Sequence, residues 1–225
     1  KVVYTVVGTE TADQIDNLVS PLSGVRGKLT NLVVNSDWTV EGAANWPALA
    51  FELNNADVTF TAGATFDSIT VTGESTITGN VTGAVIAVEG STLTVDGDIN
   101  GDVNVYGNAT INATKINGNL IVTERAKEGE AKPSVTLQSP YGVMTIGDIT
   151  NFATLNVETD VYAADVKTGS DSYTEIKTGF TLYYSGTKVQ DGTVKGKLEA
   201  GMINPGAGYE KIGDVFFVNA ETGLN

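Results

Sequence analysis

Apolar and polar residues alternate along most of the chain, and the alternation recurs at a nearly constant spacing. In the segment Val95–Val105 the odd positions are apolar or glycine and the even positions are polar. A period of two residues is typical of a strand with one buried face and one face in water. No segment of this region has the 3.6-residue period of a helix. The pattern therefore predicts short strands joined by corners.

Three rows of apolar residues recur along these segments at steps close to 17 residues. The first row consists of pairs with one residue between the two members: Leu32/Val34, Phe51/Leu53, Ile69/Val71, Ile86/Val88, Val103/Val105, Leu120/Val122 and Leu155/Val157. The second row is Phe60, Ile77, Leu93 and Ile111. The third row is Val81, Ile99 and Ile116, each followed two residues later by a glycine. We expect every row to stack as one column inside the molecule.

This repeat predicts an all-β fold, a single-stranded parallel β-helix with about 17 residues in each coil. One coil buries too few apolar side chains to offset its conformational entropy. It therefore needs hydrogen bonds and a shared core from neighbouring coils. Gly, Asn and Asp between the strand segments fit the corners because they tolerate unusual backbone angles. An antiparallel sandwich also has short alternating strands, but it does not keep a constant step over four units.

The two ends of the chain depart from the repeat and are expected to cover the exposed edges of the solenoid. Residues 1–28 form an N-terminal cap with a short helix that begins near Thr9 or Thr11 and buries Ile15. Residues 29–167 form the β-helix, with a charged loop inserted at 124–133. Residues 168–225 are rich in aromatic residues and form a C-terminal β cap or a small β subdomain.

The stretch from Ile69 to Val122 resembles the parallel β-helix repeats of bacterial surface proteins and adhesins. Within it, the segment Gly97–Gly107 is similar to the short coils of the polymer-forming bactofilins. These families imply a triangular, right-handed β-helix with a scaffold or adhesive role. The long non-repeating ends depart from the bactofilin pattern and argue against a simple end-to-end polymer.

Charge and composition narrow the classes of function. The chain has 27 acidic and 13 basic residues, a formal net charge of −14, so binding to nucleic acid is not expected. Neither His nor Cys occurs, so the chain alone cannot form a Ser-His-Asp triad, a Cys-His pair or a disulfide. No apolar run is long enough to span a membrane. We expect a monomer as an isolated domain, with no membrane insertion of this segment and no cofactor other than possible calcium.

A calcium site is one interpretation of the acidic segment around Asp96. The run Asp96-Gly97-Asp98-Ile99-Asn100-Gly101 matches the opening of a calcium-binding loop, and Asp102 follows it. The position of the expected bidentate Glu is taken by Gly107. Outward alternation along a strand explains the same residues, so the sequence leaves two interpretations open. One is a solvated acidic stripe, and the other is a calcium site of Asp96, Asp98, Asn100 and Asp102.

Threonine pairs flank the second apolar row and would form a flat face outside the solenoid. The residues of this face are Thr59, Thr61, Thr76, Thr78, Thr92, Thr94, Thr110 and Asn112. Stacked coils would place them about 4.8 Å apart. The array resembles the flat Thr-x-Thr faces of ice-binding solenoids. Threonine is also favoured on any exposed strand, which explains the same pattern without a ligand.

A polysaccharide-active enzyme of the pectin-lyase type is the remaining alternative. Asp160, Asp165 and Lys167 follow a late coil and could line a side groove. Only two Arg are present, which leaves few groups to clamp an anionic substrate. The sequence favours a non-enzymatic structural or adhesive module of a bacterial surface protein, located outside the cell or on its surface. Its expected partner is a glycan or a cell-surface protein.

Overall fold

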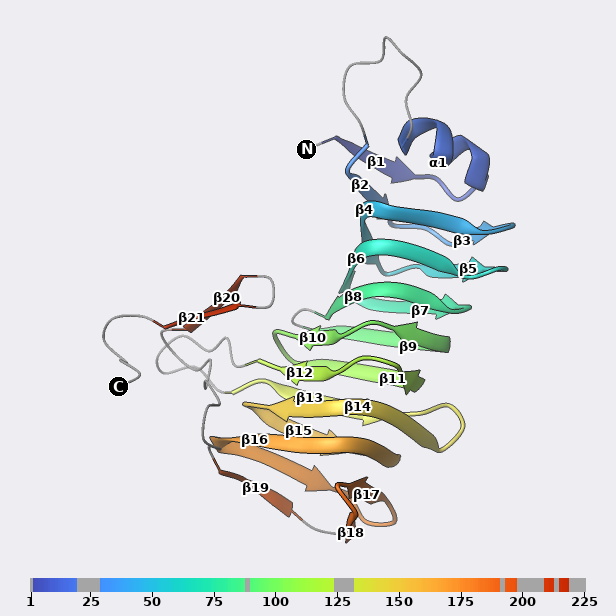
Figure 1. The fold of residues 1–225 in the computed structure, drawn as a ribbon. Coiled ribbons are helices and arrows are strands. Elements are labelled where there is room, and N and C mark those ends of the chain that lie inside the picture. Colours follow the sequence, from blue (N-terminus) through green and yellow to red (C-terminus); the bar gives the residue numbers. More distant parts are fainter. Residues whose placement is uncertain are drawn as a thin grey trace.

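The computed structural model describes residues 2–19, 29–87, 90–123, 132–190, 193–197, 209–212 and 215–218. The chain is a parallel β-solenoid of about 8 turns, with about 18 residues in each turn (Figure 1). Strands make up 66% of it and helix is scarce, so the expected all-β class and β-helix architecture are confirmed. Of the loop expected at 124–133, residues 124–131 lie outside the described residues.

Each turn visits three faces in the same order, and each face is a stack of parallel strands. Face A contains β1 (Val3–Val6), β2 (Asn31–Val34), the later parts of β4 (Ala44–Asn54), β6 (Ala64–Thr72) and β8 (Val81–Ala87), then β10 (Val103–Val105), β12 (Leu120–Val122) and the later part of β14 (Val143–Asn151). Face B contains β3 (Trp38–Val40), β5 (Asp57–Phe60), β7 (Glu74–Thr78), the earlier parts of β9 (Ser91–Asn100) and β11 (Ala109–Ile116), β13 (Ser134–Gln138) and β15 (Thr154–Val157). Face C contains the earlier parts of β4, β6, β8 and β14 and the later parts of β9 and β11. The long strand β16 (Asp160–Ile176) pairs with all three faces in turn.

The third apolar row stacks on face C as the sequence predicts. Val81 is opposite Ile99, and Ile99 is opposite Ile116. The glycines that follow these residues form a column at the corner between faces C and A: Gly83, Gly101, Gly118 and Gly147. A Cβ atom added to Gly101 would lie 2.2 Å from the carbonyl oxygen of Gly83. Only glycine therefore lets successive coils approach this closely at the corner.

The first apolar row differs from the expected one at two places, and the first of them is the coil that contains β8. Ile69 and Val71 are opposite Val85 and Ala87, so the expected pair Ile86/Val88 is wrong. At the preceding corner β6 has two unpaired residues where β8 has only Gly83. Because β8 is one residue shorter there, its inward positions come one residue earlier in the sequence than the repeat predicts. Ile86 is consequently half-exposed on the outer side of face A, and Val88 lies outside the described residues.

The late member of the first row was also assigned to the wrong face. Leu155 and Val157 lie on face B, opposite Val135 and Leu137. Face A continues through Ile149 and Asn151 of β14 instead. The 17-residue count fails here because the chain between β12 and β13 is longer than an ordinary corner.

The second row is buried throughout, but its four residues belong to three columns rather than one, and Phe60 is opposite Val40. Phe60, Ile77, Leu93 and Ile111 are all at most 2% exposed. Ile77 is opposite Val58 and Val95, whereas Leu93 is opposite Ser75 and Ile111. The strands of face B place two or three inward residues in each coil, so a shift of two residues between neighbouring coils still sets inward residues opposite each other.

The N-terminal end is covered by helix α1 (Ala12–Val19), which packs against β4. Thr11 caps the helix, because its Oγ1 accepts the N–H of Gln14 and the Gln14 side chain accepts the N–H of Thr11. Ile15 is fully buried under the helix, as expected. The helix also reaches the core through Asp16, whose carboxylate accepts the indole N–H of Trp46 at 2.6 Å.

A buried carboxylate holds the turn between β1 and α1. Glu10 is 7% exposed, and its two oxygens accept the backbone N–H groups of Val7, Gly8 and Thr9 and the hydroxyl of Tyr4. Burial alone would raise the pKa of Glu10, but these hydrogen bonds outweigh it and lower the pKa below its usual range. The ionised carboxylate therefore fixes the turn that leads into the cap.

The C-terminal end closes with antiparallel pairs instead of further parallel coils. Strand β17 (Thr181–Tyr184) pairs in parallel with β16 and then antiparallel with β18 (Thr187–Gln190). Strand β19 (Thr193–Lys197) pairs antiparallel with β16. Strands β20 (Tyr209–Ile212) and β21 (Val215–Val218) form a separate two-stranded sheet. The domain boundary expected at residue 168 falls inside β16, which continues through it.

Candidate functional site: a polar groove along face B

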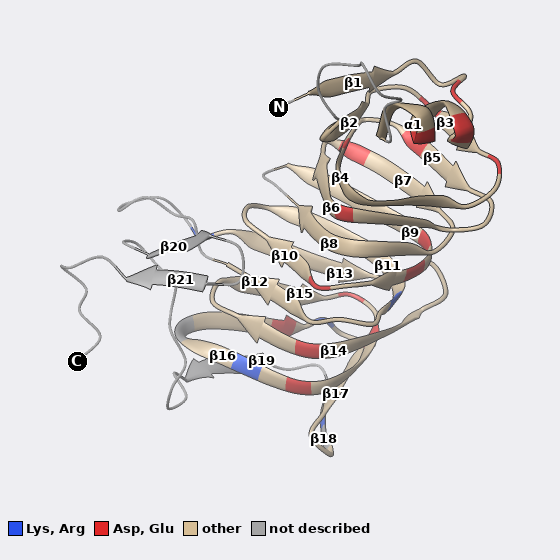
Figure 2. Ribbon diagram, turned by 45° about the horizontal axis from the view of Figure 1, so that its top comes forward, with Lys and Arg blue, Asp and Glu red and all other residues tan. Residues whose placement is uncertain are grey.

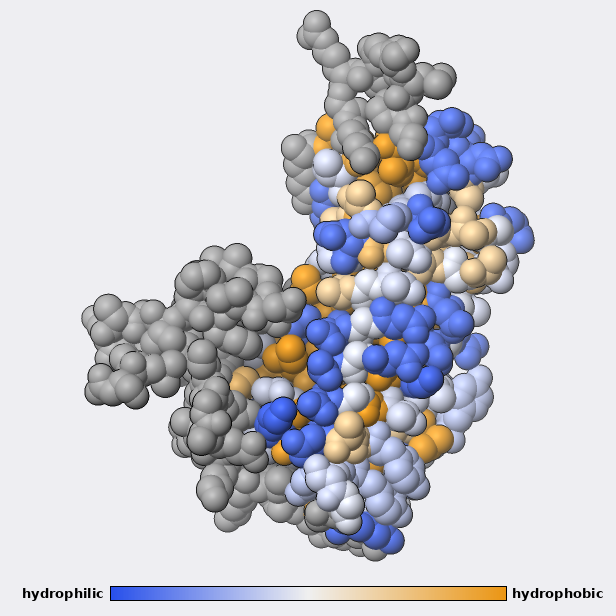
Figure 3. Space-filling model, in the orientation of Figure 1, coloured by the Kyte–Doolittle hydropathy of each residue, from blue (hydrophilic) through white to orange (hydrophobic). Residues whose placement is uncertain are grey.

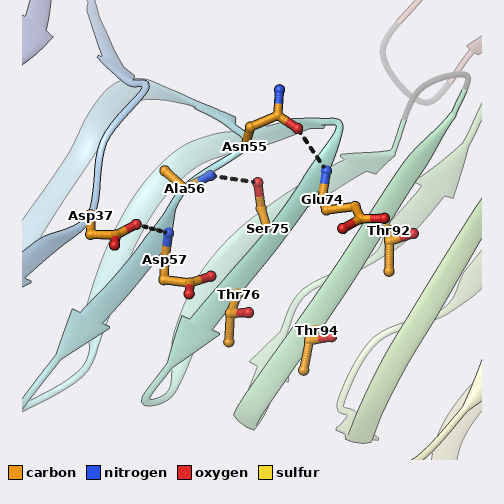
Figure 4. A pocket seen from close by; sticks show the side chains of 9 residues that line it. All are labelled: Asp37, Asn55, Ala56, Asp57, Glu74, Ser75, Thr76, Thr92 and Thr94. Atoms are coloured by element: carbon orange, nitrogen blue, oxygen red, sulfur yellow. Dashed lines mark hydrogen bonds between the residues drawn. The ribbon is translucent and has the colours of Figure 1, made fainter.

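An open groove of about 520 Å³ lies on the outer side of face B, near the N-terminal end of the solenoid (Figure 4). We call it the axial groove and define it by its nine lining residues: Asp37, Asn55, Ala56, Asp57, Glu74, Ser75, Thr76, Thr92 and Thr94. They come from four successive coils, at or next to strands β3, β5, β7 and β9. The groove therefore runs along the solenoid axis, across the strands.

Parallel stacking arranges most of the lining side chains in two columns. In the first column Asp57 is opposite Thr76, and Thr76 is opposite Thr94. Asp37 heads this column, because its Oδ1 accepts the N–H of Asp57 at 3.0 Å. In the second column Glu74 is opposite Thr92. Asn55 heads it, since its Oδ1 accepts the N–H of Glu74 at 3.1 Å.

The lining offers mainly hydrogen-bond acceptors. Among the residues that the structure describes, the carboxylates of Asp57 and Glu74 have no hydrogen-bond or ion-pair partner. Ser75 is 4% exposed, and its hydroxyl accepts the N–H of Ala56 at 3.4 Å. Within the described part of the chain that hydroxyl donates to no acceptor. None of the described residues that line the groove is Lys or Arg. The groove thus suits a ligand that donates hydrogen bonds.

The expected threonine face contributes three residues to this groove and is arranged differently from the repeat. Thr76 is opposite Thr94, not Thr92, so the expected register between these two coils is wrong. Thr92 and Thr94 are opposite Thr110 and Asn112, as expected. The remaining members lie elsewhere on the face. Thr59 and Thr78 pair in a neighbouring column that ends at Asp96, and Thr61 accepts the N–H of Gly42.

Charged and amide groups replace threonine farther along the same two columns. Thr110 is followed by Thr136, Asn156 and Glu175, and Asn112 is followed by Gln138. Beside them, the Glu158 carboxylate pairs with Lys177 and accepts a hydrogen bond from Gln138. Lys177 and Gln138 lower the pKa of Glu158, and Glu158 raises the pKa of Lys177. The purely threonine part of the face is therefore short.

The four residues of the possible calcium site contact neighbouring residues, and Asp98 and Asn100 share the side-chain amide of Asn117. Asp96 accepts the hydroxyl of Tyr141 at 3.1 Å, and Asp98 lies 3.8 Å from Lys115. Asn100 accepts the side-chain amide of Asn117, and Asp102 accepts the backbone N–H of Asn119. Across the described ranges no three acidic side chains come together as a metal-binding group.

The residues suggested for a catalytic groove near β16 also bind neighbouring coils. Asp160 accepts the N–H of Thr181 at 2.8 Å, and Lys167 lies 3.4 Å from Asp148. Asp165 accepts the hydroxyl of Ser185 at 2.6 Å. That hydrogen bond is the main reason for the lowered pKa of Asp165. These contacts stabilise the last coils.

Asp and Asn residues at the corners form a second system of contacts between coils. Seven side chains among the described residues accept a backbone N–H from the next coil: Asp37, Asn55, Asn80, Asp102, Asn108, Asn119 and Asp160. Regular strand pairing is interrupted at a corner, so a backbone N–H there needs another acceptor. The corner Asx residues supply it and hold each coil on the next.

Charge is distributed unevenly over the molecule. In Figure 2 acidic positions occur on many coils from α1 to β16, and basic positions are few. Figure 3 shows hydrophilic and weakly polar residues over much of the described surface in that view, with smaller apolar patches between them. In the parts of the chain that the structure describes, no helix has the length and apolar character needed to cross a membrane.

Sequence reasoning missed most of the axial groove. Asp37, Asn55, Asp57, Glu74 and Ser75 belong to no repeated motif, and their proximity depends on the register of neighbouring coils. One local signal was available, because Asn before a strand favours a left-handed turn, and Asn55 has a φ of 49°. Comparison with protein-family models, with curated proteins and with solved structures finds no match for this chain.

Proposed function

We propose that the chain is a non-enzymatic structural or adhesive module of a bacterial surface protein and that it works outside the cell. The observation that supports this proposal most strongly is the system of corner contacts. Along the solenoid, the seven Asx side chains bind the next coil, and the glycine column lets neighbouring coils approach closely. Such an arrangement favours a stiff rod over a mobile catalytic cleft.

A rod of this kind suits a spacer or an adhesive shaft. Its antiparallel C-terminal strands and its helical N-terminal cap end the parallel stack on both sides. The acidic surface favours solubility and repels other acidic polymers. A glycan or a protein on a cell surface is the partner that we propose for the adhesive role.

The test is a glycan-array screen of the whole purified chain combined with a polysaccharide-depolymerisation assay. We expect binding to one class of glycan without release of reducing ends or unsaturated products. Turnover of any polysaccharide would contradict the non-enzymatic role and favour the alternative enzyme of the pectin-lyase type. Absence of binding to every glycan would contradict glycan adhesion.

A further inference from the structure

We propose that the axial groove binds a glycan without acidic groups, with amino sugars preferred over neutral sugars and uronic acids rejected. The inference rests on the adhesive role proposed above and names the ligand class for it. It follows from the direction of the groove, from the hydrogen-bonding groups that line it and from their charge.

The direction of the groove fits an extended chain molecule. Its first column contains one outward residue from each of four coils, Asp37, Asp57, Thr76 and Thr94. Neighbouring strands lie about 4.8 Å apart, so the column presents a polar group at each such step along the axis. The sugar units of an extended glycan repeat at a similar distance. An oligosaccharide that lies along the axis can therefore meet one polar group per sugar.

The hydrogen-bonding groups fit the hydroxyl and amino groups of sugars. The carboxylates of Asp57 and Glu74 have no partner among the described residues, so they can accept hydrogen bonds without breaking an existing contact. Hydrogen bonds to charged acceptors are stronger than those between neutral groups. The N–H and O–H donors of sugars therefore complement these two carboxylates.

The charge of the groove selects among glycans. Three carboxylates, those of Asp37, Asp57 and Glu74, line it, and no Lys or Arg is found among its described lining residues. A uronic acid would bring a further negative charge into this space and would be repelled. A protonated amino sugar would be attracted, both by the groove and by the net charge of −14. Neutral sugars would bind through hydrogen bonds alone.

The test compares three soluble oligomers by isothermal titration calorimetry with the whole chain: the glucosamine hexamer, cellohexaose and hexagalacturonate. We expect the glucosamine hexamer to bind most tightly, cellohexaose more weakly and hexagalacturonate not at all. Raising the salt concentration to about 0.5 M should weaken binding of the glucosamine hexamer, because salt screens charge attraction. Binding of cellohexaose should change little with salt.

Two variants locate the site. Asp57→Asn combined with Glu74→Gln should reduce affinity for the glucosamine hexamer by about tenfold or more, because two charge-assisted hydrogen bonds are lost. The matched control is Glu175→Gln, which removes a carboxylate from the face B column that contains Glu74, beyond the groove. Glu175→Gln should change the affinity for the glucosamine hexamer by no more than about twofold. All of these side chains are at least partly exposed, and circular dichroism checks that the variants fold.

The outcomes separate this inference from the proposed function. Hexagalacturonate binding as tightly as the glucosamine hexamer would contradict the inferred ligand class. Glycan binding that survives the double variant unchanged would overturn the groove as the site and leave the adhesive role standing. Absence of binding to all three oligomers would overturn the inference, while binding to another ligand on the array would still support adhesion.

Discussion

Replacing Gly101 with alanine should lower the free energy of unfolding by about 3–5 kcal/mol, or prevent folding altogether, because the new methyl group has no space. Its Cβ would lie 2.2 Å from the carbonyl oxygen of Gly83. The obstacle is backbone rather than a movable side chain, so two coils must separate to admit it. That separation would also break the stacking of Ile99 on Val81 beside the corner. Urea denaturation followed by circular dichroism measures the loss.

The control for this variant is Gly142→Ala. Gly142 has a φ of 75°, and a Cβ added there would meet nothing within 4 Å. Alanine in this left-handed conformation should cost about 1–2 kcal/mol, from backbone strain alone. Equal losses for the two variants would show that the coils do not approach each other at the glycine column as closely as described.

Replacing Ile77 with aspartate should cost about 4–5 kcal/mol or more, since it places a carboxylate in the core. Ile77 is fully buried on face B, between Val58 and Val95 of the neighbouring coils. No cationic side chain lies among these neighbours to offset the charge. The same urea titration should show an unfolded chain or a much lower midpoint at pH 7.

Thr110→Asp is the matched control on the outer side of the same face. Thr110 is half-exposed and lies between Thr92 and Thr136, so the new carboxylate meets water and hydroxyl groups. Its cost should be about 1 kcal/mol or less. A loss as large as that of Ile77→Asp would mean that the inward and outward sides of face B are reversed.

The sequence was sufficient for the class of fold because one repeat is visible without any structure. Val81, Ile99 and Ile116, each with its following glycine, identify a coil and its corner, and the structure stacks them as expected. These residues are informative because the corners that follow them have no space for a Cβ atom. Where a position tolerates several residues, the repeat becomes ambiguous.

The exact register could not be read from the sequence at such positions. In the run Val85-Ile86-Ala87-Val88 both alternations are apolar, so nothing in it reveals that Val85 and Ala87 point inward. On face B the buried Ser75 lies opposite Leu93, where the repeat predicts Ile77. Ile77 lies opposite Val95 instead, a shift of two residues that the polar Ser75 concealed. Because the core is compatible with either register, the lengths of the corners determine which register forms.

The axial groove depends on that register and so could not be predicted. Thr76, Thr92 and Thr94 were expected on one face, but Asp57 joins Thr76 only because of the observed alignment. Glu74 likewise meets Thr92 only because of that alignment. The calcium and catalytic candidates came from spacing along one strand or one coil, and spacing alone does not reveal contacts between coils.

Disulfide trapping on face B tests the central claim most directly, namely that parallel coils align the columns of the axial groove. The chain has no Cys, so any disulfide would come from the introduced pair. Thr76→Cys with Thr94→Cys should oxidise readily, because opposed residues lie about 4.8 Å apart, within the range that a disulfide spans. Thr76→Cys with Thr92→Cys should not, because a diagonal offset of two residues exceeds about 7 Å. Efficient oxidation of the second pair and not the first would contradict the alignment and the groove built on it.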